Sequence, residues 1–125
     1  LLKNSYKKKI ILIDRFVDST IAYQHYGMGV NLDFIKVLNK FLLKNIKIDF
    51  TFLNLVNNKN LNLRLKKRKS LNRYDKFDVN FYNKVQKGYI KLSNKYKKSY
   101  QIIDSNLNIK NNEKFILSII DRLIK

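Results

Sequence analysis

The sequence predicts an α/β fold built on a parallel sheet. Three short apolar segments, 10–13, 49–56 and 100–103, are typical of strands. The first is a continuous aliphatic run, as expected of a strand buried on both faces. The second is rich in aromatic and β-branched residues. The stretches between them have helical periodicity, and strands that alternate with helices favour a parallel sheet.

Each predicted helix has its own signal. Residues 19–26 form a short helix that closes near Gly27. Asn31 is the expected N-cap of a helix over 32–44, and Asn57 and Asn58 precede another over 59–67. A longer helix begins at about Asp78, and a final one follows 100–103. Their apolar stripes are Leu32, Ile35, Leu38 and Leu42; Phe81, Val85, Tyr89, Leu92 and Tyr96; and Phe115, Ile116, Ile119, Ile120 and Leu123.

Length and composition limit the class of protein. The 125 residues suit one domain, 1–125, and a hydrophobic fraction of 45% excludes a disordered tail. The absence of cysteine excludes disulfides and thiolate metal sites, and His25, the single histidine, cannot anchor a zinc ion alone. We therefore expect no metal-ligand cluster. No apolar run approaches the ~20 residues of a membrane span. No signal-peptide core is visible at the start, so cytoplasmic is the default localisation.

The formal net charge of +18 has two interpretations. A polyanionic partner such as nucleic acid would explain it. Translation of an AT-rich gene, which favours Lys, Asn and Ile codons, explains it as well. Because lysines occur in every segment rather than on one face, their distribution argues against a nucleic-acid partner. The five arginines are then informative, since Lys cannot reproduce their bidentate geometry.

Two absences indicate a fragment or a decayed reading frame. The chain does not begin with Met. It has three glycines, at positions 27, 29 and 88, and no proline. An ordinary complete enzyme contains more of both.

The first predicted strand ends at Asp14 and Arg15. Ligands bind outside the carboxyl ends of parallel strands, where Arg15 could clamp a phosphate through two hydrogen bonds. Asp14 could orient Arg15 or hold magnesium through water. On the following helix Thr20, Tyr23 and Gln24 share one face that can meet a nucleoside. A strand-end salt bridge followed by an amphipathic helix explains the same residues equally well.

Four segments, in order, resemble the thymidylate kinase family. "DRFVDSTIAYQ" followed by "GMG" is similar to the signature Asp-Arg-Tyr, Ser, Ala-Tyr-Gln and Gly-x-Gly. "KIDFTFLNL" resembles the Pro-Asp-Leu-Thr strand, with Ile48 at the proline. The stretch 64–89 resembles the bacterial lid and the helix after it, ending in Gly88 and Tyr89. Departures are Met28 for an arginine, Asp75 for a glutamate and Asn72 for an acid.

The resemblance implies transfer of the ATP γ-phosphoryl group to dTMP, with Mg²⁺ accompanying ATP. Arg15 would bind the dTMP phosphate, Thr20 the thymine edge and Tyr23 the deoxyribose, with Gln24 near the nucleotides and Asp14 and Ser19 in support. A lid at about 66–76 would supply Arg68 and Arg73, which with Arg15 are the candidate catalytic residues. Arg64 would be a further lid or ATP residue, and Tyr74 and Asp75 would close over the acceptor.

The resemblance also implies a partial P-loop NTPase-type three-layer α/β/α fold whose N-terminal strands are missing. The Gly-x-x-x-x-Gly-Lys-Ser/Thr loop that cradles ATP cannot be built from glycines at 27, 29 and 88. In the family's strand order, 2-3-1-4-5, segment 10–13 would be strand 3 and would lack both neighbours. We therefore predict a chain that is inactive alone, and that is unstable or pairs its strands 3 and 4.

The family implies a homodimer, in which 32–43 could form the contact. Two alternatives stay open. One is a non-catalytic basic remnant that binds nucleic acid by charge. The other is a different nucleoside or nucleotide kinase of the same superfamily.

Overall fold

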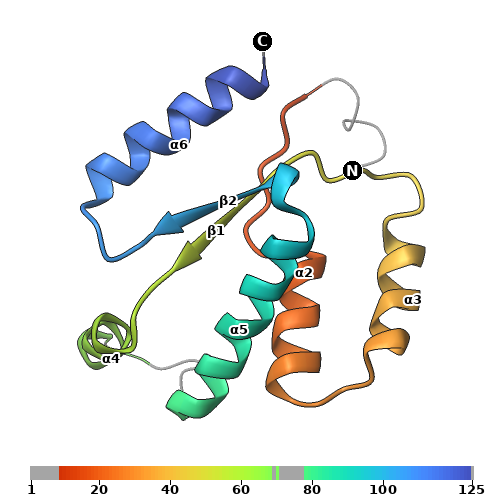
Figure 1. Ribbon diagram of the computed structural model, residues 1–125, viewed down its shortest axis with the longest axis horizontal. Coiled ribbons are helices and arrows are strands. Elements are labelled where there is room, and N and C mark those ends of the chain that lie inside the picture. The colour runs from red at the N-terminus through yellow and green to blue at the C-terminus, as the bar shows by residue number, and fades with distance from the viewer. Residues whose placement is uncertain (1–8, 69, 71–77, 125) are drawn as a thin grey trace.

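The computed structural model describes residues 9–68, 70 and 78–124. Figure 1 shows how its helices and strands are arranged. In chain order they are α2 (Val17–Thr20), the π-helix η1 (Ile21–Gly27), α3 (Leu32–Leu42), β1 (Thr51–Leu55), α4 (Asn58–Lys67), α5 (Val79–Lys95), the 3₁₀-helix η3 (Lys97–Ser99), β2 (Tyr100–Asp104) and α6 (Ile109–Leu123).

The two strands pair in parallel, as predicted. Their register runs from Thr51 opposite Tyr100 to Leu55 opposite Asp104. α5 packs against both strands and, with its other side, against α2 and η1. α6 lies on the opposite side of the sheet from α5 (Figure 1). The fold is therefore a partial α/β/α arrangement, which confirms the predicted class.

The strand predicted at 10–13 is wrong. This segment is not in a strand, and within the described residues the sheet consists of β1 and β2 only. Ile10, Leu12 and Ile13 are 66%, 80% and 46% exposed. A strand needs a neighbour for its backbone hydrogen bonds, and β1 pairs here with β2 rather than with 10–13. The predicted pairing of family strands 3 and 4 does not occur.

Side-chain caps begin the helices where the sequence predicted them. Asn31 Oδ1 accepts the Phe34 N–H at 3.0 Å, and Asn57 Oδ1 accepts the Asn60 N–H at 2.8 Å. Asp78 Oδ1 likewise accepts the Phe81 N–H at 2.8 Å. Each bond satisfies one of the backbone donors left free in a first helical turn.

The tightest packing joins η1 to α5. Ala22 and Tyr23 from η1 form a buried cluster with Phe81 and Val85 from α5. Glycine makes this close approach possible, because a Cβ on Gly88 would lie 2.5 Å from the Tyr26 ring. The two helices run in opposite directions, since Ser19 lies beside Tyr89 and Gly27 beside Phe81.

Two predicted apolar faces are only partly covered. On α3, Ile35 is buried whereas Leu38 and Leu42 are 44% and 60% exposed. On α6, Ile119 is the buried residue, and Phe115 and Leu123 are exposed. Periodicity therefore identified both helices correctly but not the extent of their burial.

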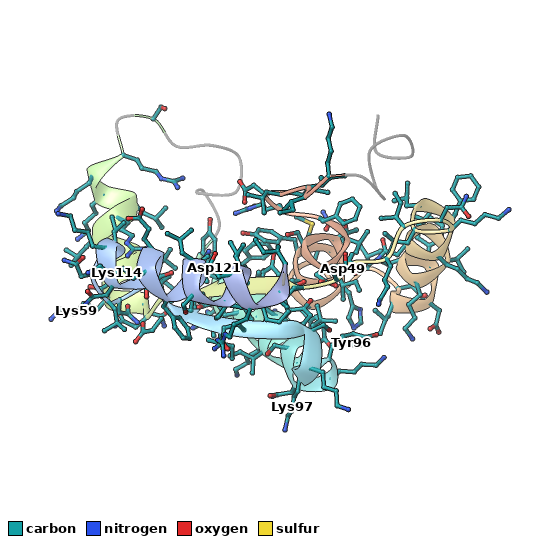
Figure 2. The ribbon with its side chains drawn as sticks, turned by 90° about the horizontal axis from the view of Figure 1, so that it is seen from above. Asp49, Lys59, Tyr96, Lys97, Lys114 and Asp121 are labelled. Carbon is teal, nitrogen blue, oxygen red and sulfur yellow. The ribbon has the colours of Figure 1, made fainter. Side chains whose placement is uncertain are left out.

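Exposed basic side chains occur on several elements. Lys59, Lys97 and Lys114, labelled in Figure 2, are exposed and come from three different elements, α4, η3 and α6. That the lysines as a whole are not gathered on one face stays a prediction.

Candidate functional site

Arg15 has an unusual backbone conformation. Its φ is +59°, in the left-handed region that L side chains rarely adopt. Such a conformation costs roughly 1–2 kcal/mol for a residue with a Cβ. Strain of this kind concentrates at functional sites, so it marks Arg15 as a candidate functional residue.

The guanidinium of Arg15 contacts Tyr23 in two ways, through a hydrogen bond and through the aromatic ring. Arg15 Nη2 donates to Tyr23 Oη at 3.1 Å, and Arg15 Cζ lies 5.0 Å from the centroid of the Tyr23 ring. The residue is otherwise exposed. Burial lowers the pKa of Arg15, but Tyr23, Tyr89 and Asp14 outweigh it and the pKa is raised. The result is a fixed cation with donors available to an anion.

Tyr23 is itself a core residue. It is 8% exposed, and the Phe81 ring meets it edge-on at 5.9 Å between centroids. It lies in the π-helical segment, where the Met28 N–H donates to the Tyr23 carbonyl five residues back at 3.0 Å. π-helical turns are rare and occur frequently at functional sites. Tyr23 therefore combines a buried ring with a hydroxyl that binds the guanidinium of Arg15.

Two further tyrosines hold the segment that carries Arg15. Ser19 Oγ and Tyr89 Oη are 2.6 Å apart, which connects α2 to α5. Tyr100 donates its hydroxyl proton to the carboxylate of Asp18, which connects α2 to the first residue of β2. Burial raises the pKa of Tyr89. Burial and the hydrogen bond to Asp18 raise the pKa of Tyr100.

The structure brings six of the predicted site residues together on one segment. Asp14 is exposed beside Arg15; Thr20 and Gln24 are half-buried on the helix that follows; Ser19 and Tyr23 lie among them. The sequence placed Arg15 at the carboxyl end of a strand, but 10–13 is not in a strand. The segment that carries Arg15 is instead hydrogen-bonded near the amino end of β2, where Tyr100 donates to Asp18.

Arg64 lies apart from this group. It is exposed on α4 and donates to the backbone carbonyl of Ser105, which follows β2. Both residues line an open cavity of about 670 Å³ at the carboxyl ends of β1 and β2. The cavity is also lined by Asn54, Leu107, Ile109, Asn112, Glu113, Ile116 and Leu117. Ligand sites in parallel sheets form at this end of the strands, so this open hollow is a candidate for one.

Most of the predicted lid lies outside the described residues. Arg73, Tyr74 and Asp75 are among these, so the structure does not place them. Arg68 is described: it follows α4 and donates its backbone N–H to the Leu65 carbonyl at 3.2 Å.

Sequence reasoning missed the roles of Tyr89, Asp18 and Tyr100. Tyr89 was predicted as part of an apolar helix stripe and as the last residue of the stretch that resembles the lid and the helix after it, without a role in the site. A tyrosine on such a stripe carries a hydroxyl that needs a partner when it is buried, and that requirement was the available signal. For Asp18 and Tyr100, 82 residues apart in the sequence, no local pattern could have indicated the contact.

The described residues contain no group of three or more His, Cys, Asp or Glu side chains placed to hold a metal. Kinases, however, bind Mg²⁺ through one or two carboxylates plus the substrate phosphates. The exposed carboxylate of Asp14, beside Arg15, fits that smaller requirement. As for membranes, each helix in the described part of the chain is too short or too polar to cross one.

Comparison with known proteins identifies relatives over most of the chain. The family model described as "Thymidylate kinase" matches residues 2–116. A thymidylate kinase of Wolbachia pipientis wMel is 36% identical over 115 residues, which covers 92% of this chain and 56% of the relative. One from Staphylococcus haemolyticus is 33% identical and covers 81% of this chain and 50% of the relative.

A solved structure agrees with these matches. The thymidylate kinase of Ehrlichia chaffeensis superimposes with a TM-score of 0.60 and 27% sequence identity, over 95% of this chain and 53% of that one. The chain thus spans about half the length of the relatives it matches.

Proposed function

Because this chain belongs to the thymidylate kinase family, we propose that it carries the monophosphate-binding part of an enzyme that phosphorylates dTMP. The reaction moves the γ-phosphoryl group of ATP to dTMP and gives dTDP, a step in dTTP synthesis. We propose a cytoplasmic protein. The observation that carries the proposal is the tethered, exposed guanidinium of Arg15 within the family match.

Arg15 binds the phosphate of dTMP in this proposal. Its Nη2 is held by Tyr23, and an exposed guanidinium has five donors, so several stay available for phosphate oxygens. Charge-assisted bonds of this kind are stronger than neutral ones and fix the orientation of a planar pair. Thr20 and Gln24, on the same helical segment, face the nucleoside.

Arg64 keeps its predicted role as a lid or ATP residue in this proposal, because it lines the hollow at the carboxyl ends of β1 and β2. Phosphoryl transfer depends mainly on positioning and on stabilisation of charge. Arg68 and Arg73 supply positive charge to the transferring group, and Tyr74 and Asp75 close over the acceptor. Mg²⁺ would enter with ATP and would supply positive charge to the phosphate oxygens, and Asp14, the residue before Arg15, would be the carboxylate that supports it.

The reaction requires groups that these 125 residues do not supply. The sequence contains no Gly-x-x-x-x-Gly-Lys-Ser/Thr loop, which P-loop kinases use to cradle ATP. We therefore propose that the chain alone is inactive and that a P-loop segment completes the site. The exposed aliphatic side chains of Ile10, Leu12 and Ile13 are the surface that such a segment would cover. We also propose a homodimer that uses the exposed side of α3, where Phe34, Val37 and Phe41 are 60–78% exposed.

Ligand-dependent stabilisation tests the assignment. We expect dTMP to raise the melting temperature of the chain, or of the chain mixed with a separately expressed P-loop segment of a related kinase, more than other nucleoside monophosphates do. In the mixture, dTDP should form from ATP and dTMP, and Arg15→Ala should abolish both effects.

The same experiment separates the alternatives. A different nucleotide kinase would respond to another monophosphate. A basic remnant would respond to DNA instead, with binding that falls steeply as salt rises and is insensitive to Arg15→Ala.

A further inference from the structure

We propose that Tyr89 is a positioning residue that holds Arg15 in its phosphate-binding orientation. This inference rests on the proposed function, since it concerns how Arg15 binds the phosphate of dTMP. Tyr89 lies on α5, 74 positions along the chain from Arg15, and reaches the site through two separate contacts.

The first contact is a hydrogen bond to the segment behind Arg15. Tyr89 Oη lies 2.6 Å from Ser19 Oγ, and Ser19 follows Arg15 by four residues. The intervening backbone includes the first residues of α2, whose Ser19 N–H donates to the Phe16 carbonyl at 2.9 Å. Fixing Ser19 therefore restricts the turn in which Arg15 adopts its left-handed conformation.

The second contact is to the partner of the guanidinium. The Tyr89 and Tyr23 rings meet edge-on, with centroids 6.5 Å apart and planes inclined at 79°. Tyr23 Oη in turn accepts from Arg15 Nη2. Tyr89 thus contacts two residues that restrict the orientation of Arg15. Ser19 acts on Arg15 through the connecting main chain, and Tyr23 acts on it through the hydrogen bond from Arg15 Nη2 to the Tyr23 hydroxyl.

The surroundings of Tyr89 favour a fixed position. The preceding residue, Gly88, is buried against Tyr26, so the helix cannot move closer to η1 or rotate freely there. A phosphate ligand would therefore meet a guanidinium that is already oriented, which reduces the entropy lost on binding.

The test is the preference of the chain for dTMP over thymidine, two ligands that differ by the phosphate. The ratio of their Kd values, from isothermal titration calorimetry, isolates the phosphate contact. Tyr89→Phe keeps the ring packing and removes the hydroxyl. We expect it to weaken dTMP binding about three- to tenfold, as for loss of one hydrogen bond, and to leave thymidine binding unchanged.

Three further variants complete the design. Ser19→Ala should reproduce the effect, and it decides the matter if Tyr89→Phe fails to fold. Tyr96→Phe, on the exposed end of α5, is the matched control and should change neither ligand. In an Arg15→Ala background, Tyr89→Phe should have no further effect.

The outcomes separate the two claims. A wild-type chain without any preference for dTMP would contradict the proposed function. A wild-type preference that persists unchanged in Tyr89→Phe or Ser19→Ala would overturn the positioning role alone. Equal weakening of dTMP and thymidine would also overturn it, because that result indicates a general structural effect.

Discussion

The left-handed backbone of Arg15 has a cost that can be measured. Arg15→Ala and Arg15→Gly both remove the hydrogen bond to Tyr23, but only glycine also relieves the backbone strain. We expect Arg15→Gly to be about 1 kcal/mol more stable than Arg15→Ala. Urea unfolding of the two variants checks this. Equal stabilities would indicate that the conformation at Arg15 carries no strain.

The hydrogen bond between Tyr100 and Asp18 predicts a pH dependence. The pKa of Tyr100 is raised in the folded chain above its ordinary value of 10.0, first by burial and then by Asp18. The folded state therefore holds the phenolic proton more tightly than the unfolded state does. The stability that this contributes is fully present below pH 10 and is lost as the pH rises through the folded-state value.

Tyr100→Phe tests that dependence. The wild type should exceed the variant in free energy of unfolding by about 1 kcal/mol at pH 7, and this difference should shrink above pH 10. Lysine titration affects both proteins equally and cancels in the difference. A difference that is constant, or that grows, between pH 9 and pH 11 would contradict the account.

At the residue scale, the functional roles inferred from the sequence stay predictions. Asp14, Arg15, Ser19, Thr20, Tyr23 and Gln24 were predicted from one contiguous stretch, and the structure describes all six. Their partners Tyr89 and Tyr100 could not be predicted, because these contacts join residues 70 and 82 positions apart and depend on the packing of α5 and β2.

At the scale of elements, the contact between η1 and α5 determines whether the site holds together. A Cβ on Gly88 would lie 2.5–2.9 Å from three atoms of Tyr26, including its own Cβ, which cannot move without the backbone. We expect Gly88→Ala to destabilise the chain by about 1–3 kcal/mol, despite the better helix propensity of alanine.

The matched control for Gly88→Ala is Asn94→Ala, an exposed position on the same helix. It should be neutral or slightly stabilising, because it gains helix propensity without a clash. Thermal unfolding followed by circular dichroism compares the two. If Gly88→Ala were as stable as Asn94→Ala, α5 and η1 would not be as closely packed as described.

Helices were predictable here where a strand was not. Asn31, Asn57 and Asp78 cap their helices through bonds to residues three positions on, so the signal is local. Whether 10–13 forms a strand depends on a neighbouring strand, which no local pattern can supply. The predictions of β1 and β2 were correct because each of these strands has its partner within this chain.

At the scale of the molecule, the described residues leave an excess of large apolar side chains exposed. They include Ile10, Leu12 and Ile13, Phe34, Val37 and Phe41 on α3, and Ile109, Leu117 and Leu123 on α6. Less apolar surface is therefore buried to offset the conformational entropy of folding.

This excess predicts a weakly cooperative chain. In calorimetry, the isolated protein should show a broad transition in which the van't Hoff enthalpy differs from the calorimetric enthalpy. Addition of a P-loop segment should sharpen the transition and raise its midpoint. A sharp two-state melt of the chain alone at high temperature would contradict the incomplete packing inferred here.

The central claim is that Arg15 grips the phosphate of dTMP, and one measurement tests it most directly. Titration calorimetry with dTMP and with thymidine gives the phosphate preference of the wild type, of Arg15→Lys and of Arg15→Ala. We predict a clear preference in the wild type, a reduced one in Arg15→Lys, since a point charge cannot form the bidentate contact, and none in Arg15→Ala. An Arg15→Ala chain that prefers dTMP as strongly as the wild type does would contradict the claim.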